Sequence, residues 1–104
     1  MPDKYRVNIT TRAQSDLDEI FDYIRQESPQ NASEVVEQIL NAAEDLEFMP
    51  ARFRVAGRSK TSGETVHARV VRPFIVYYRI DESNREVFVI HVRRGARRQP
   101  RRFD

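Results

Sequence analysis

Apolar and polar residues alternate at the start of the chain and then follow a helical period. Tyr5, Val7 and Ile9 alternate with polar residues, which predicts a short strand with one buried face. The apolar positions that follow recur three, four and seven residues apart, which predicts an amphipathic helix. Thr11 and Gln14 have the spacing of a capping box, so we expect this helix to begin at Thr11.

A second helical pattern begins at Ser28 and Pro29, a pair suited to the N-cap and the first helical position. Its apolar stripe keeps helical phase until Met49 and Pro50 end it. Two amphipathic helices joined by a few residues form an antiparallel hairpin, whose apolar side needs a third surface to cover it. The many acidic residues on the polar faces of this hairpin are predicted to be solvated surface.

The apolar rhythm disappears after the hairpin and returns as three closely spaced strands. Gly, Ser, Thr and Lys residues predict a basic loop, and the short links between the later apolar segments are typical of antiparallel neighbours. We therefore predict one α+β domain in which the hairpin packs on a mostly antiparallel sheet. Its parts are an N-terminal strand (1–10), the helix hairpin (11–49), the basic loop (50–65), a three-stranded meander (66–94) and an Arg-rich tail (95–104). The neighbour of the first strand stays open.

Alternation within the meander divides its residues between two faces of the sheet. The face expected beneath the helices carries Val66, Ala68, Val70, Phe74, Val76, Tyr78, Ile80, Phe88, Ile90 and Val92. The opposite face carries His67, Arg69, Val71, Ile75, Tyr77, Arg79, Val87, Val89, His91 and Arg93. This second face is too charged for a core and too apolar for ordinary surface. We expect it to bind a partner through an apolar strip of Val71, Ile75, Val87 and Val89 beside Arg79 and Arg93.

Composition and charge narrow the classes of function. The 104 residues include no Cys and two His, which excludes disulfides, thiol catalysis and a His-rich metal centre, and we predict no metal or cofactor. The first 50 residues carry four basic and eleven acidic side chains, whereas the remaining residues carry fourteen basic and five acidic side chains. The basic half suggests an anionic partner, either nucleic acid or an acidic protein, unless the halves neutralise each other. Without an apolar span or a leader, we expect a cytoplasmic protein with no membrane contact.

One catalytic chemistry fits these residues, namely metal-free RNA cleavage. It needs a base for the ribose 2′-hydroxyl, cations for the phosphorane charge and an acid for the leaving oxygen. Candidate cations are Arg69, Arg79, Arg93 and Arg94, and candidate acids and bases are Glu64, His67, Tyr77 and His91. The six Arg residues from Arg93 to Arg102 alternatively suggest salt-dependent binding of an anionic polymer or an acidic protein.

Three segments in this order resemble one family. They are Ala13-x-x-Asp16-Leu17-x-x-Ile20-x-x-Tyr23-Ile24, the strand Pro73–Ile80, and the run from Val89 to Arg97. Their order and spacing resemble the RelE/ParE superfamily of toxin–antitoxin toxins over nearly the whole chain, and the first segment is more similar to the ParE branch. The resemblance implies a RelE/ParE-like fold and a plasmid-stabilisation toxin that poisons DNA gyrase. It also implies a ParD-like antitoxin that wraps the toxin in a hetero-oligomer, with DNA reached only through the antitoxin or gyrase.

The RelE branch, which cleaves mRNA on the ribosome, is the alternative. It usually has Arg after the aromatic that opens the middle strand, a C-terminal Tyr, and His before the last Gly. This chain has Ile75, Phe103 and Arg94 at those places, which favours a non-nuclease. For a nuclease, the residues around the phosphate would be Arg69, His91 and Arg94. For a target- or antitoxin-binding surface, they would be Arg69, Val71, Ile75, Tyr77, Arg79, Val87, Val89, Arg93, Arg94, Arg97 and Arg98. A non-toxic adaptor that binds an acidic helix is a third possibility.

Overall fold

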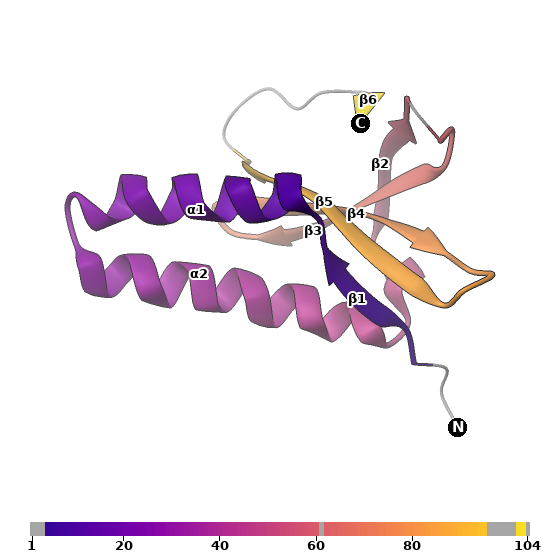
Figure 1. Cartoon of the computed structure of the whole chain (residues 1–104), viewed down its shortest axis with the longest axis horizontal. Helices are drawn as coiled ribbons and strands as arrows, with labels where there is room; N and C mark the ends of the chain where they lie inside the picture. The colour runs from indigo at the N-terminus through magenta and orange to yellow at the C-terminus, as the bar shows by residue number, and fades with distance from the viewer. Residues whose placement is uncertain (1–3, 61, 96–101, 104) are drawn as a thin grey trace.

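The computed structural model describes residues 4–60 and 62–95, and the backbone of residues 102–103. Two helices lie side by side against one face of a six-stranded sheet (Figure 1). The helices are α1 (Thr11–Arg25) and α2 (Pro29–Glu44), followed by the short 3-10 turns η1 (Asp45–Glu47) and η2 (Pro50–Arg52). The strands are β1 (Arg6–Ile9), β2 (Arg54–Ser59), β3 (Thr65–Val71), β4 (Phe74–Asp81), β5 (Glu86–Arg94) and β6 (Arg102–Phe103), in the spatial order β1-β5-β4-β3-β2-β6. The predicted α+β class is confirmed.

The position of β1, which the sequence pattern left open, is at one edge of the sheet beside β5. The two strands are parallel, whereas β5, β4, β3 and β2 are successively antiparallel. Thr10 links the end of β1 to both β5 and α1. Its Oγ1 donates to the Val89 carbonyl oxygen at 2.7 Å and accepts the Ala13 N–H at 3.2 Å. The helix cap is therefore Thr10 and not Thr11, and α1 begins where β1 leaves the edge of β5.

The second helix begins as predicted and ends earlier. Ser28 Oγ accepts a backbone N–H three residues along at 3.2 Å, and Pro29 occupies the first turn. The α-helix ends at Glu44 because the chain tightens into η1 and then reverses at Met49, whose φ of 47° is left-handed. Beyond this point the Tyr78 hydroxyl donates to the Pro50 carbonyl oxygen, which fixes η2 against β4.

The prediction of a loop over residues 50–65 is wrong in part, because β2 lies within this segment. Arg54 pairs with Ala68 of β3, and the register shifts between Val55 and Gly57. Of the side chains of β2, that of Ser59 alone is buried, and Val55 is largely exposed. A strand near the sheet edge that buries one small polar side chain leaves no apolar period in the sequence, which explains the error.

The predicted faces of β3 are reversed. Arg72 and Pro73 form a two-residue link, across which Val71 pairs with Phe74. Because paired residues lie on the same face, the helix-covered face of β3 carries the odd-numbered residues. Val66 and Ala68, predicted beneath the helices, therefore lie on the opposite face. His67, Arg69 and Val71, predicted on that opposite face, lie on the helix side.

A one-residue bulge divides β5 into two parts with different parity. Tyr78 of β4 pairs with Val89. Tyr77 pairs with His91, which leaves Ile90 as the extra residue of the bulge. A single extra residue exchanges the faces of every residue beyond it. The helix-covered face of β5 consequently carries Val87, Val89 and Val92, and the opposite face carries Phe88, Ile90, His91 and Arg93. The predicted exposure of Val87 and Val89 is therefore wrong, as is the prediction that Phe88 and Ile90 lie beneath the helices.

The main core lies between the helix hairpin and the sheet. Its fully buried members come from both helices and from three strands: Ala13, Leu17, Ile39, Ala43, Leu46, Phe74, Val76, Tyr78, Val87, Val89 and Val92. Acidic residues of the hairpin lie on its other side and are mostly exposed, as the helical pattern predicts. Among the described residues, no helix combines the length and apolar character that a bilayer crossing requires.

Candidate functional site

A second, smaller apolar cluster lies on the sheet face opposite the helices, which we call the outer face. Its buried members are Val66, Ala68, Ile75, Tyr77 and Ile90, with Ala56 and Phe88 packed against them. Tyr77 is fully buried although no helix covers it. The outer face is therefore an organised surface with its own core and not merely the solvated back of the sheet.

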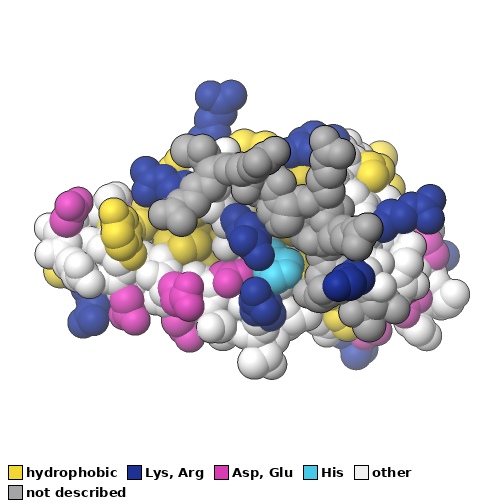
Figure 2. All heavy atoms as spheres, turned by 90° about the horizontal axis from the view of Figure 1, so that it is seen from above, with side chains coloured by type: hydrophobic (Ala, Val, Ile, Leu, Met, Phe, Trp, Pro, Cys, Tyr) yellow, Lys and Arg dark blue, Asp and Glu magenta, His cyan; other side chains and the backbone are white. Residues whose placement is uncertain are grey.

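Arginine side chains surround this cluster. Arg79 is stacked 4.3 Å from the centre of the Phe88 ring and donates to Glu64 at 2.9 Å. Arg54 and Arg93 are exposed and form no ion pair with any acidic side chain in the described part of the chain. Figure 2, which shows the molecule from above, has several Lys and Arg side chains spread over that side. The outer face thus combines an apolar cluster with uncompensated positive charge.

Tyr77 and His91 are neighbours on the outer face, because they pair across β4 and β5. His91 is 4% exposed, and its Nδ1 lies 3.6 Å from Oδ2 of Asp16 on α1. The same Asp16 oxygen accepts the Val92 N–H at 3.0 Å, at the stretch of β5 that β1 no longer covers. Burial raises the pKa of the Tyr77 phenol, so the hydroxyl stays protonated at neutral pH. Asp16, His91 and Tyr77 therefore occupy neighbouring positions on α1, β5 and β4.

Arg69 lies on the other side of the sheet, where it fastens α2 to β3. Its guanidinium donates to the Ala42 carbonyl oxygen at 2.9 Å and to Asp45 at 2.7 Å, and it stacks 4.7 Å from the Phe53 ring centre. Arg52 contacts the same carboxylate and also lies 4.7 Å from the centre of the Phe53 ring. The hydrogen bond from Arg69 holds the pKa of Asp45 below its usual value, with a smaller contribution from Arg52. These contacts give Arg69 a structural role.

The predicted nuclease set is not assembled, because Arg69 and His91 lie on opposite faces of the sheet. His67 is also on the helix side, where Nδ1 lies 3.0 Å from the Phe53 carbonyl oxygen and the ring stacks on Tyr78. Of the predicted acids and bases, the structure brings together only Tyr77 and His91 in the described part of the chain. No group of three or more described His, Asp or Glu side chains converges as metal ligands.

The predicted binding residues likewise divide between the two faces. Val71 is half-buried on the helix side, and Val87 and Val89, 0% and 1% exposed, belong to the main core. The predicted apolar strip is therefore not one surface. Of the predicted binding residues, four share the outer face: Ile75, Tyr77, Arg79 and Arg93. Arg94 is exposed at the end of β5, and Arg97 and Arg98 lie outside the described residues.

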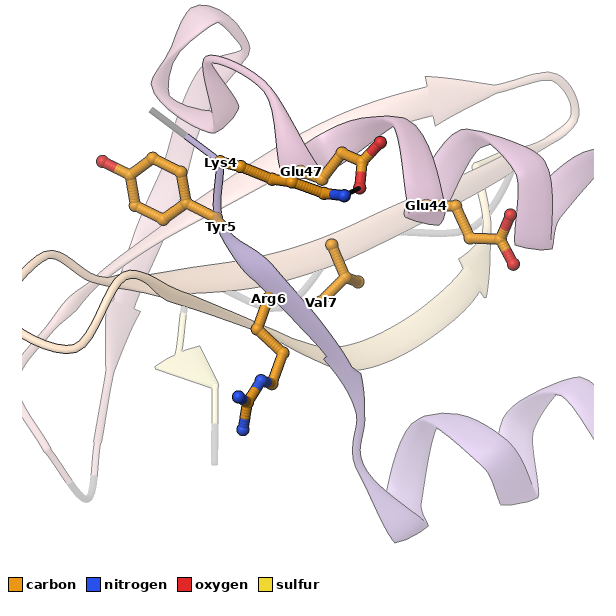
Figure 3. Close-up of a pocket in the computed structure, with 6 residues that line it drawn as sticks. All are labelled: Lys4, Tyr5, Arg6, Val7, Glu44 and Glu47. Carbon is orange, nitrogen blue, oxygen red and sulfur yellow. Dashed lines mark ion pairs between the residues drawn. The ribbon is translucent and has the colours of Figure 1, made fainter. Parts of the chain in front are cut away.

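Two shallow hollows lie elsewhere on the surface. One of about 540 Å³ separates β1 from the end of α2, where Lys4 Nζ lies 3.7 Å from Glu47 Oε2 while Tyr5 and Arg6 point away from this ion pair (Figure 3). The other, of about 560 Å³, lies between α2 and β3 and includes the Asp45–Arg69 pair. Because both are open and most of the charges that line them are already paired, the outer face is the stronger candidate site.

Two outer-face residues were missed by the sequence reasoning. Asp16 occurs in the quoted helix pattern, but only the edge position of β1 reveals that its carboxylate faces β5. Arg54 carried no signal, because it lies in the segment predicted to be a loop. Both become visible only when the strand order is known.

Comparisons with known proteins agree on the type of chain. The family profile described as "ParE toxin of type II toxin-antitoxin system, parDE" matches residues 7–99. The protein Y4kP of Sinorhizobium fredii (strain NGR234), named as a candidate toxin, is 38% identical over 86 residues, which cover 83% of this chain and 86% of Y4kP.

Solved structures show the same fold. A chain of the chromosomal ParDE toxin–antitoxin system from P. aeruginosa superposes with a TM-score of 0.67 and 25% identity, covering 88% of this chain and 96% of that one. A chain of the RelBE2 toxin–antitoxin complex from Mycobacterium tuberculosis superposes with a TM-score of 0.57 and 27% identity, covering 88% of this chain and 98% of that one. A chain of the archaeal RelE–RelB complex from Pyrococcus horikoshii superposes with a TM-score of 0.63, covering 91% of this chain and 99% of that one. At 15% identity, this match shows a shared fold only.

Proposed function

The chain belongs to the ParE toxin family of type II toxin–antitoxin systems, and we propose that it inhibits DNA gyrase without being a hydrolase. The observation that carries the non-hydrolytic reading is the placement of Arg69, which is bound to Asp45 and Ala42 on the helix side. A phosphate-cleaving site on the outer face would lack this cation. The surface that remains for gyrase is the outer face with Arg54 and Arg93.

A supercoiling assay tests this proposal. Purified toxin is titrated against gyrase, relaxed plasmid and ATP, and the supercoiled product is separated by gel electrophoresis. The proposal predicts inhibition at toxin concentrations comparable to that of gyrase. Full supercoiling at a large excess of folded toxin would exclude gyrase as the direct target.

We further propose that a ParD-like antitoxin neutralises this chain in a cytoplasmic hetero-oligomer. The solved structures from P. aeruginosa and M. tuberculosis are of toxin–antitoxin systems, which supports this partner. The exposed cations of the outer face suit a segment of the antitoxin with acidic and aliphatic residues that folds as it binds. Because binding to the folded state stabilises it, the toxin should melt at a higher temperature with antitoxin than alone. Equal melting temperatures would contradict this pairing.

One observation favours mRNA cleavage as the second candidate. Tyr77 and His91 occupy paired positions on the outer face, and Asp16 lies beside the imidazole, so a candidate acid and a candidate base come from neighbouring positions there. Primer extension on translated mRNA after toxin induction decides this alternative. Cuts in register with the ribosomal A site would support it, whereas uncut mRNA together with growth arrest would remove it.

A further inference from the structure

Two exposed arginines come from strands at opposite sides of Tyr77. We propose that Arg54 and Arg93 form a phosphate-binding pair that holds the phosphodiester backbone of a nucleic acid directly. This goes beyond the proposed inhibition of gyrase, and it differs from the expectation that DNA is reached only through other proteins. It holds whichever enzyme is the target, because it concerns binding by this chain alone.

The strand register places the two arginines on the outer face, on opposite sides of Tyr77. Arg54 pairs with Ala68, and Ala68 pairs with Tyr77, so these residues form one row across β2, β3 and β4. The row continues to His91 on β5, and Arg93 follows two residues later on the same face. Two strand spacings separate Arg54 from Tyr77 by roughly 10 Å. Arg93 lies diagonal to Tyr77 at about 7–8 Å, within reach of a long side chain.

Electrostatics agree with this placement. Burial raises the pKa of Tyr77, and the positive charges of Arg54 and then Arg93 oppose that rise. Both guanidiniums therefore lie close enough to the phenol to favour negative charge there. The two cations lie on either side of Tyr77 and both attract an anion that binds over this part of the outer face. A phosphate has several oxygens and can accept N–H donors from both guanidiniums at once.

Several other arginines are neutralised by carboxylates within the fold. Arg52 and Arg69 share the carboxylate of Asp45, and Arg79 is paired with Glu64. Within the described part of the chain, Arg54 and Arg93 have no such acidic partner. Their positive charge is therefore available to a ligand.

The part of β5 that carries Arg93 is held in place from beneath. Ile90 bulges out of the ladder, and the Asp16 carboxylate accepts the N–H of Val92 immediately beyond the bulge. The imidazole of His91, almost fully buried, lies beside the same carboxylate. These contacts fix the backbone of β5 next to Arg93, which reduces the backbone entropy lost when a ligand binds.

A polyanion fits the surroundings better than a single anionic group or a short acidic peptide. Further exposed cations of the basic half also lack an acidic partner among the described residues, namely Lys60 and Arg72 in the turns at the two ends of β3. An extended phosphodiester chain can contact the central pair and these outlying charges together. Each neutralised phosphate releases counterions, so binding should weaken steeply with salt.

The test measures binding of the full chain to fluorescein-labelled oligonucleotides by anisotropy over a series of salt concentrations. One arm uses duplex DNA and another single-stranded RNA, which distinguishes the two sources of phosphodiester. The variants are Arg54→Met, Arg93→Met and the double variant. Arg25→Met is the matched control, because it removes the same charge from the far end of α1, where Arg25 is exposed. Melting curves confirm that all variants are folded.

We expect each single variant to bind about tenfold more weakly at moderate salt, and to lower the slope of log K against log salt by about one. Arg25→Met should change the affinity by less than about twofold, since its charge does not touch the ligand. Equal losses in Arg25→Met and Arg93→Met, or no loss in the double variant, would overturn the proposal. A double variant that loses affinity for a labelled polyglutamate peptide and keeps its affinity for both nucleic acids would also overturn it, in favour of an acidic protein partner.

Discussion

Replacing Arg69 with Met should destabilise the protein far more than replacing an exposed arginine. The guanidinium donates to the Ala42 carbonyl oxygen near the end of α2 and to Asp45, and it stacks on Phe53. Met keeps most of the apolar stem but loses all three interactions. Arg69→Met therefore separates the role that the structure gives this residue from the ligand-binding role that the sequence predicts.

The magnitude follows from the three lost contacts. Losing a charged donor to a half-buried carbonyl costs about 1.5–3 kcal/mol of unfolding free energy. The cation–π contact adds about 0.5–1 kcal/mol, and the ion pair with the half-exposed Asp45 about 0–1 kcal/mol after solvent screening. Because Met restores some packing and such terms are not additive, we expect a net loss of about 2 kcal/mol. For a domain of this size that lowers the melting temperature by about 10 °C.

The assay is thermal unfolding by circular dichroism, with Arg93→Met as the matched control. Arg93 is exposed and without an acidic partner in the described part of the chain, so its replacement should cost less than about 0.5 kcal/mol. Equal melting temperatures for Arg69→Met and Arg93→Met at neutral pH would refute the structural role of Arg69.

Acid gives a second check on the same contacts. Arg69 holds the pKa of Asp45 below its ordinary value of 3.8 in the folded state. The ion pair therefore stabilises the fold above that value, and its contribution disappears as the pH falls through the lowered pKa. The difference in stability between the wild type and Arg69→Met should become smaller in that acidic range. A difference that grows there would contradict this assignment.

Three further substitutions test other contacts. Tyr78→Phe removes the donor to the buried Pro50 carbonyl oxygen and should lower the free energy of unfolding, measured by urea denaturation, by about 1 kcal/mol. An unchanged urea midpoint would contradict this role of the hydroxyl. Val89→Ala should lower the free energy of unfolding by about 2 kcal/mol in the same denaturation assay, because Val89 lies in the main core. A change near zero would contradict this buried position. Gly95→Ala would place a methyl group 3.2 Å from the Pro73 carbonyl oxygen and should lower the melting temperature by several degrees, whereas an unaltered value would show that the strand end yields freely.

The helix hairpin was predictable because its apolar period is local. Ser28 and Pro29 mark the start of α2 in the sequence as clearly as in the structure. The three later strands were predictable for the same reason, since apolar segments with short links are antiparallel neighbours. Two strands were not predicted: β2, which buries little more than Ser59 and so leaves no periodic signal, and the two-residue β6 within the segment predicted as a tail.

The outer face was only partly predictable, because assigning faces requires the register between strands. Tyr77 and Arg79 were placed correctly by alternation within β4. Val89 was placed on the wrong face because β5 has a bulge at Ile90, and one extra residue reverses everything on one side of it. Arg69 was misplaced by the pairing across the two-residue link, which alternation within one strand cannot reveal.

Gyrase inhibition by matched arginine variants tests most directly whether this ParE-family chain acts through its outer face. The measured quantity is the toxin concentration that halves supercoiling, for the wild type, Arg93→Met and Arg25→Met. The account predicts that Arg93→Met raises this concentration about tenfold and that Arg25→Met leaves it unchanged, because only Arg93 lies on the outer face. Equal concentrations for the two variants, or no inhibition by the folded wild type, would contradict it.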